Sequence, residues 1–247
     1  MDLTGQVALL TGSSGGLGRS IALELAKAGS DVALHYFRHR EAAETLLEEV
    51  TALGRRAVAV QADVRDAEQV EAMVRALLES LGRIHILING AGVSRDAMVW
   101  KMKPGDWDAV VRTNLGGAFN CARAVLPVMR EQGGGRIVSL ASVVGQAGIA
   151  GTSAYAASKA GLMGFTRAVA REVAPKNITV NALALGYFSA GVIHTLSADM
   201  QEAVLRQIPF GRFGDPRHVG QLIVFLCSEA GGYITGQTIN INGGVYM

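Results

Sequence analysis

The sequence predicts an α/β fold in which one doubly wound, parallel sheet of about seven strands carries helices on both faces. Three observations indicate this fold. Short runs rich in Val, Ile, Leu and Ala recur, and each is followed by a longer segment of helical period. The runs are apolar without alternation, as in strands that are covered on both sides. The 247 residues show no internal repeat and no linker, so we expect a single domain over residues 1–247.

Strands and helices alternate along almost the whole chain. The expected strands span residues 7–10, 31–36, 57–61, 84–89, 136–140, 178–182 and 238–241. The expected helices span about 16–28, 41–53, 66–81, 106–131, 153–174 and 216–228. Residues 186–214 depart from this alternation because they place about thirty residues between the sixth strand and the last helix. Insertions at this edge of an open sheet commonly shape a pocket, so we expect a substrate loop here.

The composition excludes several classes of protein. With 49% hydrophobic and 18% charged residues the chain is not disordered, and a net charge of +2 without charge blocks argues against a nucleic-acid surface. Two uncharged stretches, 137–158 and 177–198, are broken by polar residues, which favours buried structure over a membrane span. The first residues do not resemble a signal peptide, and we expect a cytoplasmic protein.

Cysteine and histidine give no sign of a disulfide framework or a metal site. Cys121 and Cys227 lie far apart, so we expect free, buried thiols. The five histidines show no metal-ligand spacing, and His85, inside an apolar run, is interpreted as part of the core. We therefore predict no bound metal.

A glycine-rich turn at residues 11–18 follows the first strand directly and opens the first helix. Glycines let the backbone approach a pyrophosphate, and the free N–H groups of a helix start attract its charge. A flexible turn is the alternative, but the place between strand and helix favours a dinucleotide site of the Rossmann type. The predicted cofactor contacts in this turn are Gly12, Ser13, Ser14, Gly16, Leu17 and Gly18.

The turn after the second strand indicates which dinucleotide binds. Sites that select NAD usually carry an acid there, whereas residues 35–40 contain no acid and two arginines. Arginine binds phosphate through parallel hydrogen bonds, which suits the 2′-phosphate of NADPH. We predict this contact for Arg38, and for Arg40 a solvated helix start is an equal alternative. The same basic turn argues against S-adenosylmethionine, which has no 2′-phosphate.

Tyr155 and Lys159 are four residues apart and share one face of an expected helix. A phenol ionises near pH 10, too high for ready proton transfer at neutral pH, and a nearby ammonium favours the phenolate. On its own this spacing is common, and an interface tyrosine beside a solvated lysine would be the favoured explanation.

Further motifs in the sequence favour a catalytic role for Tyr155 and Lys159 over a purely structural one. The chain carries the following set: Thr-Gly-x-x-x-Gly-x-Gly at residues 11–18, Asn-Gly-Ala-Gly at 89–92, Asn114, Ser142, and Tyr-x-x-x-Lys at 155–159. With this set it resembles the short-chain dehydrogenase/reductase family from residue 7 to residue 244. Within the family it is similar to the 3-oxoacyl-[acyl-carrier-protein] reductases and the acetoacetyl-CoA reductases. The segments that carry this closer likeness are 94–96 with 101–102, 142–145, 171–174, and 233–236 through 242–244.

The resemblance implies catalytic roles for four residues. Tyr155 would pass a proton to the substrate oxygen, and Lys159 would lower the phenol pKa and bind the nicotinamide ribose. Ser142 would donate a hydrogen bond to the carbonyl oxygen. Asn114 would hold a water that links Lys159 to solvent. Local alternatives are that Ser142 satisfies backbone at a strand end and that Asn114 caps or bends its helix.

The resemblance also implies further cofactor contacts. The set comprises Asp63 and Val64 at the adenine, Asn89, Ala91 and Gly92 at the adenine ribose, Tyr155 and Lys159 near the nicotinamide, and Gly186 and Phe188 after the sixth strand. For Asp63, capping the next helix is an alternative. The chain departs from the family pattern at Gly90, which replaces an asparagine, at Leu185, which replaces a proline, and at Ala190, which replaces a threonine. Ser189 could supply the missing hydroxyl.

The expected substrate is a hydrophobic ketone, because the predicted pocket is apolar around a polar centre. Its walls are Met98, Ser142, Val144, Gly148, Ile149, Tyr155, Tyr187 and Phe188. The resemblance implies NADPH-dependent reduction of a 3-oxoacyl thioester, linked to acyl carrier protein or CoA, and a homotetramer formed through the two long helices. The alternatives are an NADPH-dependent carbonyl reductase for ketones unrelated to fatty acids and a regulatory NADPH-binding protein without catalysis.

Overall fold

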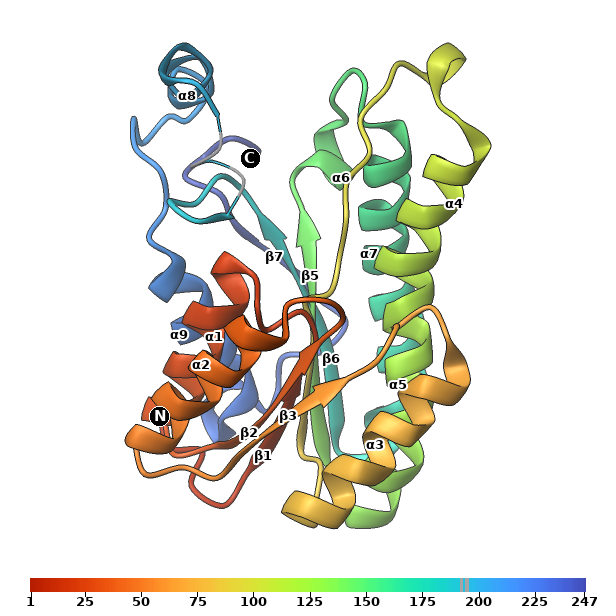
Figure 1. The fold of residues 1–247 in the computed structure, drawn as a ribbon, viewed down its shortest axis with the longest axis vertical. Coiled ribbons are helices and arrows are strands. Elements are labelled where there is room, and N and C mark those ends of the chain that lie inside the picture. Colours follow the sequence, from red (N-terminus) through yellow and green to blue (C-terminus); the bar gives the residue numbers. More distant parts are fainter. Residues whose placement is uncertain (192, 194–195) are drawn as a thin grey trace.

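The computed structural model describes residues 1–191, 193 and 196–247, and its centre is one sheet of seven parallel strands (Figure 1). The strands stand in the order β3-β2-β1-β4-β5-β6-β7. Their bounds are β1 (Val7–Leu10), β2 (Asp31–Tyr36), β3 (Ala57–Gln61), β4 (Ile86–Asn89), β5 (Gly135–Ser142), β6 (Ile178–Leu185) and β7 (Thr238–Ile241). The prediction of a doubly wound parallel sheet is thereby confirmed.

Helices cover both faces of the sheet (Figure 1). One layer consists of α1 (Gly16–Lys27), α2 (Arg40–Ala52) and α9 (Pro216–Cys227), and the other of α3 (Ala67–Leu81), α5 (Gly117–Gln132) and α7 (Ser153–Val173). Side chains alternate between the two cores along each strand. In β1, Ala8 and Leu10 pack in the first core, and Val7 and Leu9 in the second. Burial on both faces explains why the strand runs are apolar throughout.

The long helix expected over 106–131 is interrupted. It consists of α4 (Pro104–Val111), a π-helical turn (Arg112–Gly116) and α5. Such turns insert one extra residue per turn and often occur at functional sites. Asn114 lies in this π-helical turn.

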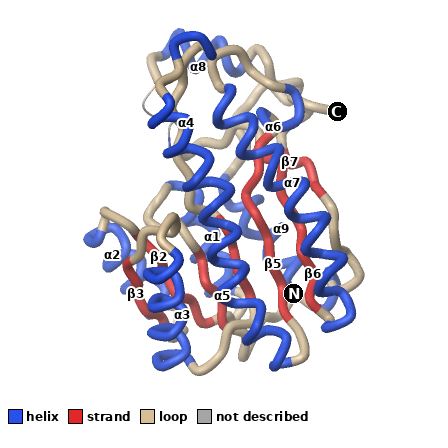
Figure 2. Tube along the Cα trace, turned by 90° about the vertical axis from the view of Figure 1, so that its right-hand side faces the viewer, coloured by secondary structure: helices blue, strands red, loops and turns tan. Residues whose placement is uncertain are grey.

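Several short elements are absent from the sequence prediction. They are α6 (Val144–Ala147), α8 (Ala198–Leu205) and the 3-10 turns η1 (Val99–Lys101), η3 (Ala174–Lys176) and η5 (Glu229–Gly231). The segment 186–214 therefore contains a helix and is not a loop throughout, and its residues 192, 194 and 195 lie outside the described residues. Figure 2 shows α6 and α8 above the carboxyl ends of the strands.

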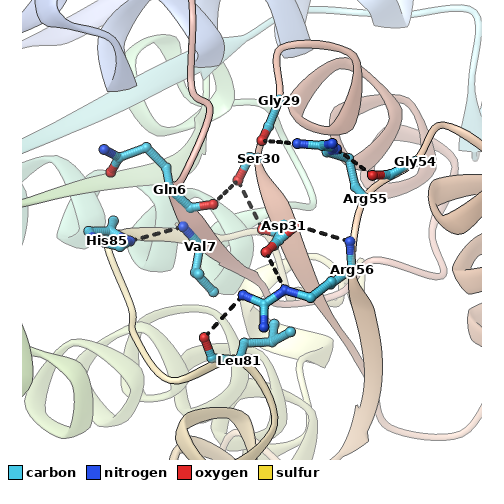
Figure 3. A network of polar contacts seen from close by, with 10 residues as sticks. All are labelled: Gln6, Val7, Gly29, Ser30, Asp31, Gly54, Arg55, Arg56, Leu81 and His85. Atoms are coloured by element: carbon cyan, nitrogen blue, oxygen red, sulfur yellow. Dashed lines mark hydrogen bonds and ion pairs between the residues drawn. The ribbon is translucent and has the colours of Figure 1, made fainter.

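A polar network closes the opposite, amino edge of the sheet (Figure 3). Asp31 at the start of β2 accepts hydrogen bonds from the backbone and the side chain of Arg56, at 2.9 and 2.8 Å. His85 Nδ1 accepts a hydrogen bond from Val7 N at 3.0 Å. His85 thus belongs to the structural framework, as expected, and it pairs with backbone at the start of β1.

The carboxyl edge has the geometry of a ligand site. The connection that leaves β1 runs through α1 over one face, and the connection that leaves the adjacent β4 runs through α4 and α5 over the other. Between two such connections a crevice opens outside the strand ends, where ligands bind in α/β sheets. Among the described residues, we find no helix long and apolar enough to cross a membrane. Cys121 and Cys227 are free and buried, as predicted.

Candidate active site

The turn between β1 and α1 is packed too closely for side chains at its glycines. Gly12 has φ of 72°, and a Cβ there would lie 2.9 Å from the backbone of Ala91. A Cβ at Gly16 would lie 2.7 Å from Gly191 N, because residues 190–191 rest on the start of α1. Gly15, at the helix N-cap, makes no side-chain cap. The first N–H groups of α1 therefore depend on other partners, as an anion-binding helix start requires.

The remaining predicted residues of this turn divide between core and surface. Ser13 is buried, and its hydroxyl donates to His35 O at 3.0 Å. Gly18 is buried, and Ser14 and Leu17 are half-buried, with Leu17 packed against the core. Sequence reasoning did not find His35, whose side chain also contacts the turn through Gly12 N at 3.1 Å. The only sequence signal was a histidine at the end of an apolar strand.

The chain after β4 lies directly against the glycine turn. Thr11 Oγ1 accepts hydrogen bonds from Gly90 N at 3.0 Å and Ala91 N at 3.2 Å. A Cβ at Gly90 would lie 2.7 Å from Thr11 O, so glycine fits this close approach. Asn89 Nδ2 donates to Ser139 Oγ at 3.2 Å, and Asn89 Oδ1 is buried without a partner among the described residues.

The two arginines after β2 have different surroundings. The Cζ atom of Arg38 lies 5.0 Å from the centroid of the Phe37 ring, and Arg38 makes no ion pair among the described residues. Arg40 Nε, in contrast, lies 2.7 Å from a carboxylate oxygen of Glu44 one turn along α2. A guanidinium without a carboxylate partner is available to bind a phosphate group. A guanidinium that is already paired with a carboxylate is less available for this contact. The two candidates thus differ in that Arg40 has a carboxylate partner, and the phosphate contact of Arg38 stays a prediction.

Asp63 and Val64 lie after β3, beside the same edge. Hydrogen bonds from the Arg65 side chain hold the pKa of the Asp63 carboxyl below its usual value. The alternative that Asp63 caps the next helix is wrong, because Asp66 accepts hydrogen bonds from Glu68 N and Gln69 N. Val64 is buried, and a Cβ at Gly117 would lie 2.6 Å from its side chain.

Tyr155 and Ser142 meet where β5 ends and α7 begins. The Ser142 side chain lies close enough to the Tyr155 phenol to lower its pKa, and Ser142 Oγ accepts a hydrogen bond from Val144 N at 3.2 Å. Burial raises the pKa of the Tyr155 phenol above its ordinary value, Asp96 acts in the same direction, and the Ser142 side chain opposes both. The net shift of the phenol pKa is therefore upward in this structure, and the lowering effect expected of Lys159 stays a prediction. Burial outweighs the favourable interactions of the charged form.

Lys159 lies one turn beyond Tyr155, as the spacing predicts, and is buried. Its Nζ donates to Leu140 O at 2.6 Å and lies 5.5 Å from the centroid of the Tyr155 ring. Burial lowers the pKa of Lys159 to about 8. The ammonium thus lies beside the Tyr155 ring and donates to a strand carbonyl of β5.

Asn114 connects three segments of the site. Its Oδ1 accepts a hydrogen bond from Val93 N at 2.8 Å, and its Nδ2 donates to Val93 O and Ser158 Oγ, each at 3.0 Å. A Cβ at Gly92 would lie 3.2 Å from Asn114 Oδ1 and 3.7 Å from Lys159 Nζ. The side chain therefore links the chain after β4 to α7. The expected role of Asn114 in holding a water that connects Lys159 to solvent stays a prediction.

The predicted substrate walls belong to segments that follow strands at the carboxyl edge, and their arrangement around the substrate stays a prediction. Met98 and Ile149 are exposed, Val144 and Tyr187 are half-buried, and Gly148 has φ of 71°. Ala97 N donates to Gly151 O at 2.8 Å, which ties the loop before Met98 to the loop after α6. Burial raises the pKa of Tyr187. Apolar side chains thus remain accessible in these segments.

The segment after β6 is well packed despite its departures from the family pattern. Leu185 continues the strand, opposite Ser142 on β5 and Ile241 on β7, and this explains why β6 extends beyond residue 182. A Cβ at Gly186 would lie 2.7 Å from Asn242, and Phe188 packs in the core with its ring against Gly214. Ser189 Oγ donates to Gly214 O at 3.3 Å.

These features fit a nicotinamide dinucleotide. Glycines at positions 12, 16 and 18 permit close backbone approaches that a Cβ would prevent, α1 begins without a side-chain cap, and Asn89 Oδ1 at the end of β4 is buried without a partner among the described residues. The residues fitted to hold the cofactor are those of the 12–18 turn, Arg38, Asn89 and the Tyr155–Lys159 pair. Among the described residues, no group of three or more His, Cys, Asp or Glu side chains could hold a metal ion.

Comparisons with known proteins agree with this geometry. A family model described as Enoyl-(Acyl carrier protein) reductase matches residues 12–246. The "3-oxoacyl-[acyl-carrier-protein] reductase FabG" of Staphylococcus aureus is 45% identical over 240 residues, which are 97% of this chain and 98% of that protein. The "3-oxoacyl-[acyl-carrier-protein] reductase" of Synechocystis is 43% identical over 246 residues, 99% of this chain and 98% of that one.

A solved structure gives the same result. The putative short-chain alcohol dehydrogenase from Sinorhizobium meliloti is 43% identical, has a TM-score of 0.93, and is covered over 97% of its length by 99% of this chain. Family membership implies a nicotinamide cofactor and oxidoreductase chemistry. The chain belongs to the short-chain dehydrogenase/reductase family, and it is similar over its whole length to reductases of 3-oxoacyl groups.

Proposed function

We propose that the protein catalyses NADPH-dependent reduction of a 3-oxoacyl thioester, linked to acyl carrier protein or to CoA, to the 3-hydroxyacyl product. The observation that carries the proposal is the proximity of the Tyr155 phenol to the Ser142 side chain, beside the buried Lys159, whose Nζ lies 5.5 Å from the centroid of the Tyr155 ring. Because the Tyr155 and Ser142 hydroxyls lie close together, both can contact the carbonyl oxygen of one substrate molecule. The similarity to two proteins named 3-oxoacyl-[acyl-carrier-protein] reductase supports the choice of substrate.

The site supplies a proton and an electrostatic environment for the reduction. Bound NADPH would supply the hydride to the carbonyl carbon. The Tyr155 hydroxyl gives its proton to the carbonyl oxygen, and Ser142 donates a hydrogen bond to the same oxygen as negative charge develops there. The Lys159 ammonium then stabilises the phenolate that remains. Asn114 keeps Val93 and Ser158 in place around these groups.

Arg38 supports the choice of NADPH over NADH. It is the arginine of the turn after β2 whose guanidinium has no carboxylate partner among the described residues, and a 2′-phosphate would provide one. Asp63 and Val64 at the end of β3 are proposed to contact the adenine. In that role Asp63 would share its carboxylate with Arg65, because both oxygens already accept hydrogen bonds from that side chain.

Exposed apolar side chains near the site support an acyl substrate. Val99 is 67% exposed, Trp100 73% and Phe210 71%, and they belong to the segment after β4 and to the 186–214 insertion. Both segments leave strands at the carboxyl edge, so they can border the chain of a hydrophobic ketone. We propose that residues 186–214 form the substrate loop. A carrier protein is proposed as the partner when the acyl group is delivered on one.

We also propose a homotetramer formed through the helix pair of α4–α5 and α7. Phe119 on α5 and Trp107 on α4 are exposed, as side chains at a subunit interface would be in a single chain. The small residues do not all point to this interface. Ala122 and Ala154 are buried in the chain's own core, and the Leu115 side chain packs against Gly161, where a Cβ would lie 2.7 Å from it. A monomeric mass at micromolar concentration would overturn the proposed tetramer.

The experiment is a turnover assay with matched tyrosine variants. Protein, NADPH and acetoacetyl-CoA are mixed, the loss of nicotinamide absorbance is followed, and simple ketones are compared with acyl thioesters. Tyr155→Phe should lower kcat by about 100-fold or more, the contribution expected of a positioned acid, while leaving NADPH affinity unchanged. Tyr233→Phe, at a fully exposed tyrosine, is the control and should behave as wild type.

The outcomes separate the candidate functions. Turnover of thioesters supports the proposal, and turnover of simple ketones alone supports a general carbonyl reductase. NADPH binding without turnover of any substrate would indicate a regulatory protein. A near-normal rate for Tyr155→Phe would remove the assigned proton donor.

A further inference from the structure

His35, at the end of β2, is buried between the glycine turn and the chain that leaves β3. Only 2% of the residue is exposed. Its Nδ1 accepts a hydrogen bond from Gly12 N at 3.1 Å, and its Nε2 lies 3.0 Å from Ala62 O. Each ring nitrogen therefore has one backbone partner, and the two partners belong to the strand connections on either side of β2.

The partners determine the protonation state of the ring. A backbone N–H can only donate and a carbonyl oxygen can only accept. Both contacts are satisfied when the ring is neutral and carries its hydrogen on Nε2. A charged ring would place a second N–H against the N–H of Gly12, so one hydrogen bond would become a repulsion between two donors.

His35 also contacts the next residue of the turn. Ser13 N and Ser13 Oγ both donate to His35 O at 3.0 Å. Gly12 has φ of 72°, a left-handed conformation, and the chain after β4 closes its other side, with the Ala91 backbone 2.9 Å from where a Cβ would lie. The turn is thus fixed by β2 from one side and by the β4 connection from the other, four residues before α1 begins at Gly16.

We propose that His35 is a positioning residue, whose neutral ring holds Gly12 in the left-handed conformation from which the turn binds the dinucleotide. Protonation of the ring would then weaken cofactor binding without any contact between His35 and the cofactor. The inference rests on the proposed function, because it assigns that turn to the cofactor.

The surroundings of the ring contain one ion pair. The residues that β1 brings to the ring, Gly12 and Ser13, carry no charge. The chain after β3 brings Asp63, whose carboxylate is paired with Arg65 at 2.5 Å. Burial lowers the pKa of His35 below its ordinary 6.5, and the hydrogen bond with Ala62 and the charge of Asp63 oppose that shift. The ring is neutral at pH 7, and the pH effect lies below 6.5.

The test compares NADPH affinity across pH 5 to 8 for the full-length protein and three variants. In His35→Asn the amide oxygen can replace Nδ1 as acceptor for Gly12 N, and the side chain does not titrate. His35→Gln keeps a donor within reach of Ala62 O, and His35→Leu removes both partners. The 2′-phosphate of NADPH itself titrates near pH 6. The readout is therefore the ratio of wild-type to variant Kd at each pH, repeated with NADH.

The wild-type Kd should rise, relative to His35→Asn, by about tenfold for each pH unit below the pKa of the ring in the free protein, until the ring is protonated in the cofactor complex too. At pH 7, His35→Asn should bind like wild type and His35→Leu should bind weakly at every pH. A wild-type to His35→Asn ratio that is constant from pH 5 to 8 would overturn the proposal. The proposal would also be overturned if His35→Gln, which lacks the acceptor for Gly12 N, bound NADPH as tightly as His35→Asn.

A second measurement needs no cofactor. Nitrogen-15 NMR of the imidazole at pH 7 should show Nε2 protonated and Nδ1 not, and the Gly12 amide resonance should shift as the ring is protonated. The opposite tautomer would overturn the inference. If the tautomer is as stated but neither NADPH nor NADH binds, the proposed function fails, and the cofactor role of His35 fails with it.

Discussion

The Nζ atom of Lys159 lies 5.5 Å from the centroid of the Tyr155 ring, and the same atom donates a hydrogen bond to Leu140 O at 2.6 Å. Burial moves both groups toward neutrality, because it lowers the pKa of Lys159 to about 8 and raises that of Tyr155. A phenol with a raised pKa keeps its proton at neutral pH. Proton transfer to the substrate is most efficient when the pKa of the acid lies near the operating pH, so bound cofactor and substrate would have to lower the pKa of Tyr155 again.

Replacing Lys159 by methionine should stabilise the fold at neutral pH while abolishing turnover. The folded-state pKa of Lys159 is about 8, against the ordinary 10.5, so folding below pH 8 carries the full penalty of burying the charge. That penalty is about 3 kcal/mol, and the lost hydrogen bond to Leu140 O offsets about 1 kcal/mol of the gain. The stabilisation should diminish as pH rises through 8 and vanish above 10.5. Urea unfolding at pH 7 and pH 10 measures it, and a less stable variant at pH 7 would contradict it.

Arg38 and Arg40 form a matched pair for cofactor selectivity. Arg38→Ala should raise the Kd of NADPH by roughly 10- to 100-fold, the range of one or two hydrogen bonds to a charged group, and leave that of NADH nearly unchanged. Arg40→Ala should have little effect on either, because Arg40 is paired with Glu44. Fluorescence titration with both cofactors is the measurement. Equal losses of NADPH and NADH affinity in Arg38→Ala would remove the phosphate assignment.

Restoring the family's asparagine at Gly90 should destabilise this protein. A Cβ there would lie 2.7 Å from Thr11 O, and backbone cannot move aside as a flexible side chain can. We expect Gly90→Asn to lower the free energy of unfolding by about 1 to 3 kcal/mol, the usual cost of overpacking. Gly105→Asn is the control, because nothing lies within 4 Å of that position. Thermal unfolding of the two variants compares them, and an unchanged Tm for Gly90→Asn would be evidence against the close approach.

Asn114→Ala should weaken the fold more than Asn120→Ala. Asn114 makes three hydrogen bonds, to Val93 N, Val93 O and Ser158 Oγ, whereas Asn120 donates one, to Val64 O. With about 1 kcal/mol for each bond, the free energy of unfolding should fall by about 3 kcal/mol in the first variant and about 1 in the second. Denaturant unfolding tests the order, and equal losses would contradict the linking role of Asn114.

The sequence predicted the architecture because the relevant signals are local. Each strand run is apolar on both faces, the glycine turn adjoins its strand and helix, and Tyr155 and Lys159 are separated by one helical turn. All seven strands appear in the structure, with β5 and β6 longer and β4 shorter than expected. The π-helical turn at Asn114 and the helix α8 were missed, because neither leaves a periodic signal in the sequence.

Which side chains pair with one another, and which groups are buried, was decided only by the folded structure. Arg38 and Arg40 look alike in the sequence, and the helix geometry of α2 pairs Arg40 with Glu44. Asp63 looks like a helix cap until Asp66 is seen to occupy that place. The direction of the Tyr155 pKa shift and the contact of His35 with Gly12 follow from burial among strands that are far apart in the chain. The sequence determined which groups could meet, and the loss of water around them determined their charge and their partners.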